Sequence, residues 1–170
     1  QLQQLLQRIV AGRLTARHLD LASGRTTLAD ASSQDTLQWG GQRLTTIHGP
    51  PLRLLIIGAG QISGYLASMA QALDYAVTVC DPREEYRAAW QVANVALSAE
   101  MPDDAVLALN ADARTAIVAL THDPKLDDMA LLEALKSPAF YVGALGSKAN
   151  NSQRKQRLRQ YFDLTEAEVA

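Results

Sequence analysis

The hydrophobic pattern of the chain changes near residue 50. Before it, apolar residues alternate with polar ones or recur at helical spacing, and after it continuous apolar runs alternate with stretches of helical spacing. Alternation is typical of half-exposed strands, whereas continuous apolar runs are typical of parallel strands buried on both faces. The pair Pro50-Pro51 interrupts strand pairing and marks the boundary. The sequence therefore predicts a small α+β segment over 1–50 and a larger domain over 51–170.

The first segment is expected to hold one helix and a small antiparallel sheet. The helix covers 2–10 and stops near Gly12; its apolar positions are Leu2, Leu5, Leu6 and Ile9. Alternation on both sides of Ser23-Gly24 predicts a β-hairpin, and "QRLTTIH" at 42–48 predicts a third strand. The segment has little to cover the apolar stripe of its helix. We therefore expect it to be the remnant of a larger domain and the protein to form a homodimer.

From Leu52 onward, strands and helices alternate. The predicted strands are 52–58, 76–81, 94–97, 115–120 and 140–147. The predicted helices lie between them, and that over 62–73 rests on the spacing of Ile62, Leu66, Met69 and Leu73. Such alternation predicts a doubly wound, mostly parallel Rossmann-like α/β sheet of strand order 3-2-1-4-5.

Composition narrows the classes of partner. The chain of 170 residues is 48% hydrophobic and 20% charged with a formal net charge of −2, which is ordinary for a globular protein and argues against a nucleic-acid partner. No apolar run approaches the ~18 residues of a membrane helix. The single cysteine, Cys80, is expected to be a buried inert thiol, and no Cys/His cluster indicates a metal site. We expect a cytoplasmic protein without a membrane or nucleic-acid partner.

A glycine-rich turn, Gly58-Ala59-Gly60-Gln61-Ile62-Ser63, follows the first strand of the larger domain. In dinucleotide-binding domains the first glycine permits a tight turn, the second lets the backbone approach a pyrophosphate, and the third position requires a small residue. Serine at 63 meets that need. Asp81 ends the next strand, where an acid would accept a hydrogen bond from a ribose 2′-hydroxyl. The alternative is a Rossmann-like fold with a tight turn and no ligand.

Arg83 follows Asp81 at the carboxyl end of the second strand. Three roles stay open for it: holding a phosphate, stacking on a heterocycle, or pairing in solvent with Glu84 or Glu85.

Two further polar stretches follow the fourth and fifth strands. Thr121-His122-Asp123 is expected to face the glycine turn across the point where the strand order reverses. His122 is interpreted there as a ligand contact or proton carrier, with local capping as the alternative. Gly146-Ser147-Lys148 offers close backbone approach, a hydroxyl and a positive charge beside a helix N-terminus, a combination that favours an oxyanion.

The segments "RLLIIGAG", "THDPKLDD" and "FYVGALGSK" together resemble the carboxyl-terminal domain of the XdhC/CoxI family, the xanthine dehydrogenase accessory factors. The resemblance covers roughly residues 52 to 165, and the stretch before Pro50 resembles the family's connecting region. Gln61 stands where the family often has histidine, and the family's cysteine-bearing amino-terminal segment is absent, so we expect a piece of a longer protein.

The resemblance implies an accessory factor that binds the molybdenum cofactor (molybdopterin) as cargo. It further implies help in sulfuration by a cysteine desulfurase and in insertion into a molybdoenzyme of the xanthine dehydrogenase class. No catalytic residue is assigned. The implied cofactor-binding residues are Gly58, Gly60, Gln61, Ile62, Asp81, Arg83, His122, Asp123, Gly146, Ser147 and Lys148. The alternatives are an NAD(H)-dependent oxidoreductase, favoured by the glycine turn with Asp81, and a nucleotide-sensing regulatory module.

Overall fold

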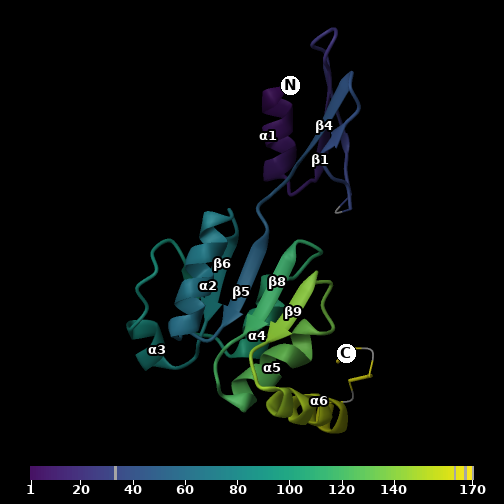
Figure 1. Ribbon diagram of the computed structural model, residues 1–170. Helices are drawn as coiled ribbons and strands as arrows, with labels where there is room; N and C mark the ends of the chain where they lie inside the picture. The colour runs from purple at the N-terminus through teal and green to yellow at the C-terminus, as the bar shows by residue number, and fades with distance from the viewer. Residues whose placement is uncertain (33, 163, 167, 170) are drawn as a thin grey trace. The chain divides into compact units, whose positions relative to one another are not determined.

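The computed structural model describes residues 1–32, 34–162, 164–166 and 168–169 (Figure 1). It divides the chain into two compact units, Gln1–Pro51 and Leu52–Ala170. Each unit is described by itself.

The smaller unit consists of one helix and a four-stranded antiparallel sheet of order β2-β1-β4-β3. Its elements are α1 (Leu2–Val10), β1 (Thr15–Asp20), β2 (Thr26–Asp30), β3 (Gln38–Trp39) and β4 (Arg43–His48). The predicted helix, hairpin and third strand are present. β3 was not predicted because two residues are too few to show alternation.

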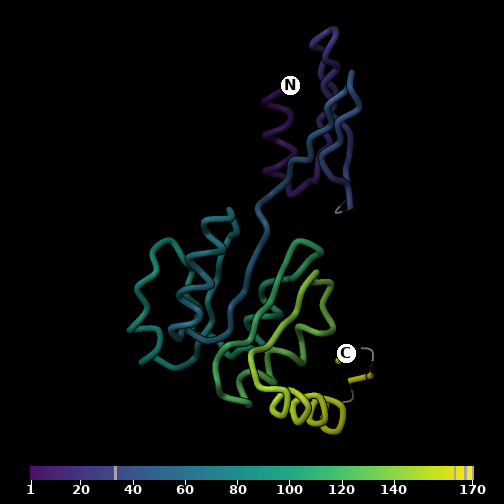
Figure 2. Tube along the Cα trace, viewed as in Figure 1, coloured from purple at the N-terminus to yellow at the C-terminus, as the bar shows by residue number. Residues whose placement is uncertain are grey.

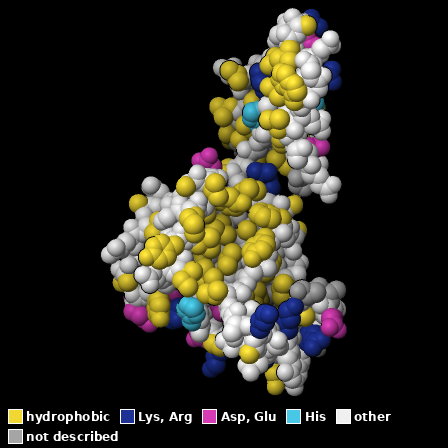
Figure 3. All heavy atoms as spheres, viewed as in Figure 1, with side chains coloured by type: hydrophobic (Ala, Val, Ile, Leu, Met, Phe, Trp, Pro, Cys, Tyr) yellow, Lys and Arg dark blue, Asp and Glu magenta, His cyan; other side chains and the backbone are white. Residues whose placement is uncertain are grey.

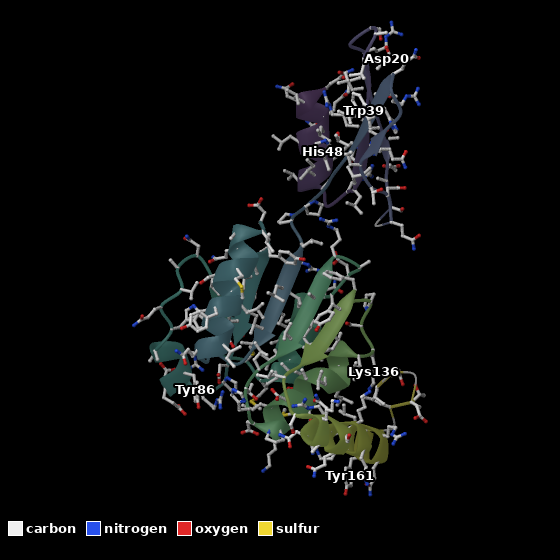
Figure 4. The ribbon with its side chains drawn as sticks, in the orientation of Figure 1. Asp20, Trp39, His48, Tyr86, Lys136 and Tyr161 are labelled. Atoms are coloured by element: carbon white, nitrogen blue, oxygen red, sulfur yellow. The ribbon has the colours of Figure 1, made fainter. Side chains whose placement is uncertain are left out.

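Local hydrogen bonds fix the hairpin of the smaller unit. The Asp20 carboxylate accepts from the Ser23 amide at 2.8 Å, and Gly24 follows with φ +67°, which glycine adopts without strain. His18 is hydrogen-bonded to the Thr45 hydroxyl at 2.9 Å, and His48 to the Thr46 hydroxyl at 2.8 Å. Figure 4 labels His48. Both histidines therefore have structural roles.

The larger unit is a five-stranded parallel sheet of order β7-β6-β5-β8-β9, which confirms the predicted order 3-2-1-4-5 and the Rossmann-like class. Figure 2 lets the reader follow the chain through it. Its strands are β5 (Arg53–Ile57), β6 (Ala76–Cys80), β7 (Ala96–Ser98), β8 (Thr115–Ala119) and β9 (Tyr141–Ala144). Its helices are α2 (Gln61–Ala72), α3 (Glu84–Ala88), α4 (Pro102–Leu109), α5 (Pro124–Ala134) and α6 (Lys148–Phe162).

Alternate residues of the central strand serve two separate cores. Leu55 and Ile57 pack with α4, α5 and α6 on one face of the sheet, and Leu54 and Ile56 pack with α2 on the other. Figure 1 shows α2 and α5 on opposite faces of the sheet. This double burial explains the continuous apolar runs of the sequence. None of the described helices is both long and apolar enough to cross a bilayer.

The packing of α2 differs from the pattern expected of an amphipathic helix. The residues it buries are the small ones, Ser63, Ala67 and Ala70, because they let the helix lie close to the sheet. Its larger apolar residues stay exposed, including Ile62, Met69 and Leu73. The helical spacing was therefore correct, but it marks a flank of α2 instead of its core face.

Candidate cofactor-binding site

Four loops follow the carboxyl ends of β6, β5, β8 and β9, which are neighbours in that order in the sheet. All the predicted binding residues lie in these loops or in the first turn of the helices that follow them. Between β5 and β8 the chain order reverses, and doubly wound sheets bind their ligands at such a point.

Gly58 is required by the protein's own backbone. It has φ +103°, and a Cβ at this position would lie 2.9 Å from the Thr121 Cα. Its amide also donates to the Cys80 carbonyl at 2.7 Å. Gly58 thus lets the loops after β5 and β8 touch.

Gly60, in contrast, faces open space. It is the N-cap of α2, its φ is −83°, and an added Cβ would meet nothing within 4 Å. No side chain caps the helix, so the first-turn amides at the exposed residues Gln61 and Ile62 lie at its positive end. Ser63 is buried, and its hydroxyl finds no hydrogen-bond partner among the described residues. The start of α2 can therefore accept an anionic oxygen.

Asp81 lies under this turn, fully buried. One carboxylate oxygen accepts from the Ala59 amide and from Arg83 Nη2, each at 2.8 Å. The other accepts from Arg83 Nε at 2.8 Å and from the Arg83 amide at 3.1 Å. Burial by itself raises the pKa of Asp81, but the hydrogen bonds from Arg83 and Ala59 outweigh it and hold that pKa below its ordinary value. Both oxygens are thus engaged within the protein, and ribose binding by Asp81 stays a prediction.

Arg83 pairs with Asp81, directly after β6, and not with Glu84 or Glu85. Its guanidinium also stacks on the ring of Tyr86, 3.8 Å from the ring centre. Figure 4 labels Tyr86 on α3. Arg87 donates to the Asp81 carbonyl at 2.6 Å. Sequence reasoning missed Tyr86 and Arg87 because α3 is too short to show a pattern, although Tyr86 stands one helical turn after Arg83.

The loop after β8 holds His122 in an unusual conformation. His122 has φ +60°; the other described non-glycine residues with positive φ are the turn formers Asp74, Asn94 and Asn110. Its imidazole is exposed and has no hydrogen-bond partner within the part of the chain that the structure describes. Asp123 caps α5 by accepting from the Lys125 amide at 2.9 Å. Asp123 therefore has a structural role, whereas His122 is free to contact a ligand.

The loop after β9 meets the His122 loop around a cavity of about 160 Å³. Ser147 caps α6 by accepting from the Asn150 amide at 3.2 Å, and Gly146 and Lys148 are exposed. The lining residues are His122, Pro124, Asp127, Leu145, Gly146, Asn150, Gln153, Arg154 and Arg157. The structure thus brings His122 and Gly146 together around one cavity. Gly58, Gly60 and Asp81 form a second group, which adjoins the first because Gly58 lies against Thr121, the residue before His122.

Three ion pairs join α5 to α6 beside this cavity: Arg154 pairs with Asp127 and with Asp128, and Arg157 pairs with Asp128. Arg154 donates to Asp127 at 2.9 Å, and Arg157 donates to Asp128 at 2.6 Å. Asp127 also accepts from the amide and hydroxyl of Thr121, at 3.1 Å and 2.7 Å. Both aspartates therefore neutralise arginines of α6. The stretches "THDPKLDD" and "GALGSK" are therefore parts of one packed unit.

Cys80 is fully buried, and burial together with the adjacent Asp81 raises the pKa of its thiol to about 11. No three side chains of the His, Cys, Asp or Glu type gather as metal ligands in the described ranges.

The parallel sheet, the glycine turn and the uncapped helix start define a Rossmann-type domain of the kind that binds nucleotides and related cofactors. The family model described as the XdhC Rossmann domain matches residues 54–170. The chain therefore belongs to the XdhC family, and the resemblance drawn from its motifs is confirmed.

A crystal structure from Bacillus halodurans, described as a xanthine dehydrogenase, has the same fold. The two are 19% identical with a TM-score of 0.71, over 91% of this chain and 55% of that one. The chain thus spans little more than half the length of that relative. A search of curated proteins finds no match.

Proposed function

We propose that this protein is an accessory factor for molybdoenzymes of the xanthine dehydrogenase class. It binds the molybdenum cofactor as cargo, assists its sulfuration with a cysteine desulfurase, and helps to insert it into the apo-enzyme, in the cytoplasm. Membership of the XdhC family supports the link to xanthine dehydrogenase, and the site supports the choice of cargo.

The open, uncapped start of α2 at Gly60 is the observation that carries this proposal. Molybdopterin bears a phosphate, which is extended to a dinucleotide in some forms. A phosphate oxygen placed at the first turn of α2 meets free amides and the positive end of the helix. The free imidazole of His122 and the backbone at Gly146 lie on the next two loops and suit the polar edge of a pterin.

The Asp81–Arg83 pair favours cargo binding over hydride transfer. An NAD-binding domain uses its acidic residue to accept from the ribose hydroxyls, but both oxygens of Asp81 already accept from Arg83 and Ala59. Asp81 could accept a hydrogen bond from a ribose hydroxyl only if Arg83 moved away from its carboxylate. NAD binding remains the competing outcome of the test.

An anaerobic calorimetric titration with molybdopterin, and separately with NADH, tests the proposal. Gly60→Asp places a carboxylate at the start of α2, where it caps the helix and repels a phosphate. Since φ is −83° and the space is open, the variant should fold normally. Gly64→Ala is the matched control, because its new Cβ makes only an ordinary contact with Val92 at 3.7 Å.

We expect molybdopterin to bind the parent chain and Gly64→Ala, and to bind Gly60→Asp at least about tenfold more weakly. His122→Asn keeps a residue that tolerates positive φ and should also weaken binding. NADH binding without pterin binding would replace the proposal with the oxidoreductase. Equal pterin affinity in Gly60→Asp and its control would show that the start of α2 is not the phosphate site.

A further inference from the structure

The cavity between the loops after β8 and β9 combines a buried ion pair with exposed neutral side chains. Its buried part is Asp127 with Arg154, whose side chains are 2% and 9% exposed. His122, Asn150 and Gln153 line it at exposed positions. In Figure 3 hydrophobic side chains gather over α2 and the adjoining strands, whereas Lys and Arg side chains are prominent around α6. The cavity thus lies in the polar part of the larger unit.

The charges that line the cavity cancel. Arg154 is paired with Asp127 at 2.9 Å and lies 3.4 Å from Asp128. Arg157 is paired with Asp128 at 2.6 Å. Two guanidinium groups therefore share two carboxylates, and no net positive charge is left to hold a phosphate. The cavity favours an uncharged group, because an uncharged group gives up less hydration than an ion when it enters.

Three neutral side chains around the cavity have unused hydrogen-bonding capacity. The side chains of His122, Asn150 and Gln153 have no hydrogen-bond partner among the residues that the structure describes. Each amide side chain offers two donors and a carbonyl acceptor. A ligand whose edge alternates donors and acceptors can satisfy both amides, whereas an apolar ligand would leave them without partners.

The ion pairs leave one acceptor position and one donor group unused. Asp127 accepts two hydrogen bonds from Thr121 and one from Arg154, so one of the four acceptor positions of its carboxylate is open. Asp128 engages Nε and Nη2 of Arg157, and Nη1 has no partner within the described ranges. A carboxylate acceptor and a guanidinium donor on one cavity match a ligand that carries an amino group and a carbonyl.

The size and position of the cavity suit one end of a ligand. Its volume of about 160 Å³ is below the roughly 300 Å³ of a pocket that encloses a whole small ligand. The cavity adjoins the glycine turn, because Gly58 lies against Thr121. A ligand with its phosphate at the start of α2 can therefore place a flat ring in the cavity.

We propose that this cavity binds the amino- and oxo-substituted pyrimidine edge of a fused heterocycle, the edge that pterins and guanine share. The Asp127 carboxylate accepts from the ring amino group, and Nη1 of Arg157 donates to the ring carbonyl. The amides of Asn150 and Gln153 bond to the ring nitrogens. The assignment rests on the proposed function for the choice of a pterin, since it places one end of the proposed cargo here. Guanine in the nucleotide half of a dinucleotide is the second source of the same edge.

Fluorescence titration of the full chain with free pterin tests the inference. Free pterin has the edge without a phosphate, so its binding does not depend on the start of α2. Lumazine has a carbonyl in place of the amino group, and its oxygen would oppose the carboxylate of Asp127. We expect pterin to bind the parent chain and lumazine to bind at least about tenfold more weakly. Calorimetry with guanosine separates the two sources: binding of guanosine without pterin would support the edge but assign it to the nucleotide half.

Two variants test the residues that would bond to the ring nitrogens. Asn150→Ala and Gln153→Ala shorten exposed side chains of α6, so the fold should be kept, and circular dichroism checks this. Gln156→Ala is the matched control, because Gln156 is an exposed glutamine of the same helix outside the cavity lining. Each cavity variant should weaken pterin binding at least about fivefold, and the control should leave it unchanged. Gly60→Asp should also leave it unchanged.

Three results would overturn the inference. They are no binding of pterin or guanosine at about 1 mM, equal affinity for pterin and lumazine, and equal pterin affinity in the two cavity variants and Gln156→Ala. Titration with molybdopterin separates this inference from the proposed function. Equal molybdopterin affinity in the parent chain and both cavity variants would keep the proposed function and overturn the inference. A parent chain that binds pterin but not molybdopterin would do the reverse.

Discussion

Arg83 holds the buried carboxylate of Asp81 from two sides, with Nε and Nη2 each donating at 2.8 Å. The pair is bidentate, with each nitrogen donating to a different carboxylate oxygen, and bidentate pairs are among the strongest contacts of this kind. It connects the end of β6 to the first turn of α3, and through the Ala59 amide to the glycine turn. The local order of the site therefore depends on the ionised form of Asp81.

Acid should weaken the fold through Asp81. Because its folded-state pKa lies below the ordinary value, the stabilisation is present above about pH 4, the unfolded-state pKa. It is lost as the pH falls through the folded-state pKa. Urea unfolding of the parent chain and Asp81→Asn should thus show a difference in the free energy of unfolding that is largest at neutral pH and shrinks below pH ~4.

Replacing Arg83 should reverse the direction in which acid changes the free energy of unfolding. In Arg83→Met, Asp81 is left buried without its cation, and burial raises its pKa. The variant should be destabilised at pH 7 and regain part of the loss on acidification toward pH 5, as protonation removes the buried charge. A variant whose loss is independent of pH would contradict this account of the pair.

Two of the ion pairs between α5 and α6, Arg154–Asp127 and Arg157–Asp128, should differ in their contribution to stability. The side chain of Arg154 is 9% exposed and that of Asp127 is 2% exposed, so Arg154→Met leaves a buried, uncompensated carboxylate. We expect a loss of about 3 kcal/mol in the free energy of unfolding. The side chain of Arg157 is 35% exposed, and Asp128 keeps a second cation, Arg154, at 3.4 Å, so Arg157→Met should cost about 1 kcal/mol or less. Similar losses in chemical denaturation would show that burial does not set the strength of these pairs.

Gly58→Ala should destabilise the larger unit. The new Cβ would lie 2.9 Å from the Thr121 Cα in a backbone conformation that L-residues rarely adopt. We expect a loss of about 2 kcal/mol or more, measured by thermal and urea unfolding. Gly60→Ala is the comparison and should unfold like the parent chain. A stable Gly58→Ala chain would mean that the two loops move apart at little cost.

Cys80 should be unreactive in the native protein. Its thiol is buried and its pKa is raised to about 11, so very little thiolate exists at pH 8. A thiol reagent should label the native chain slowly and the urea-unfolded chain at once. Ala149→Cys, at an exposed position on α6, should react quickly in the native state and serves as the control.

The order of strands could be predicted from the sequence because a parallel strand that is buried on both faces has a continuous apolar sequence, which is easy to recognise. The run "RLLII" becomes β5, with Leu55 in one core and Leu54 in the other. The positions of the polar loops followed from that order.

The partners within those loops could not be predicted in the same way. Arg83 could pair with Asp81, Glu84 or Glu85, and only the direction of the chain after β6 selects Asp81. Arg154 and Asp127 are 27 positions apart, and no local pattern joins them. The side of α2 that packs on the sheet could not be predicted either, because a helical repeat shows that one side is apolar but not which neighbour that side contacts.

The two oxygens of Asp127 serve different parts of the unit. One accepts from Thr121, next to His122, and the other accepts from Arg154 of α6. A carboxylate shared in this way makes the shape of the His122 loop and the docking of α6 thermodynamically linked. Ligand that tightens the loop must, by reciprocity, slow hydrogen exchange in α6. Hydrogen exchange in α6 would thus report on a ligand bound at a site that most of this helix does not touch.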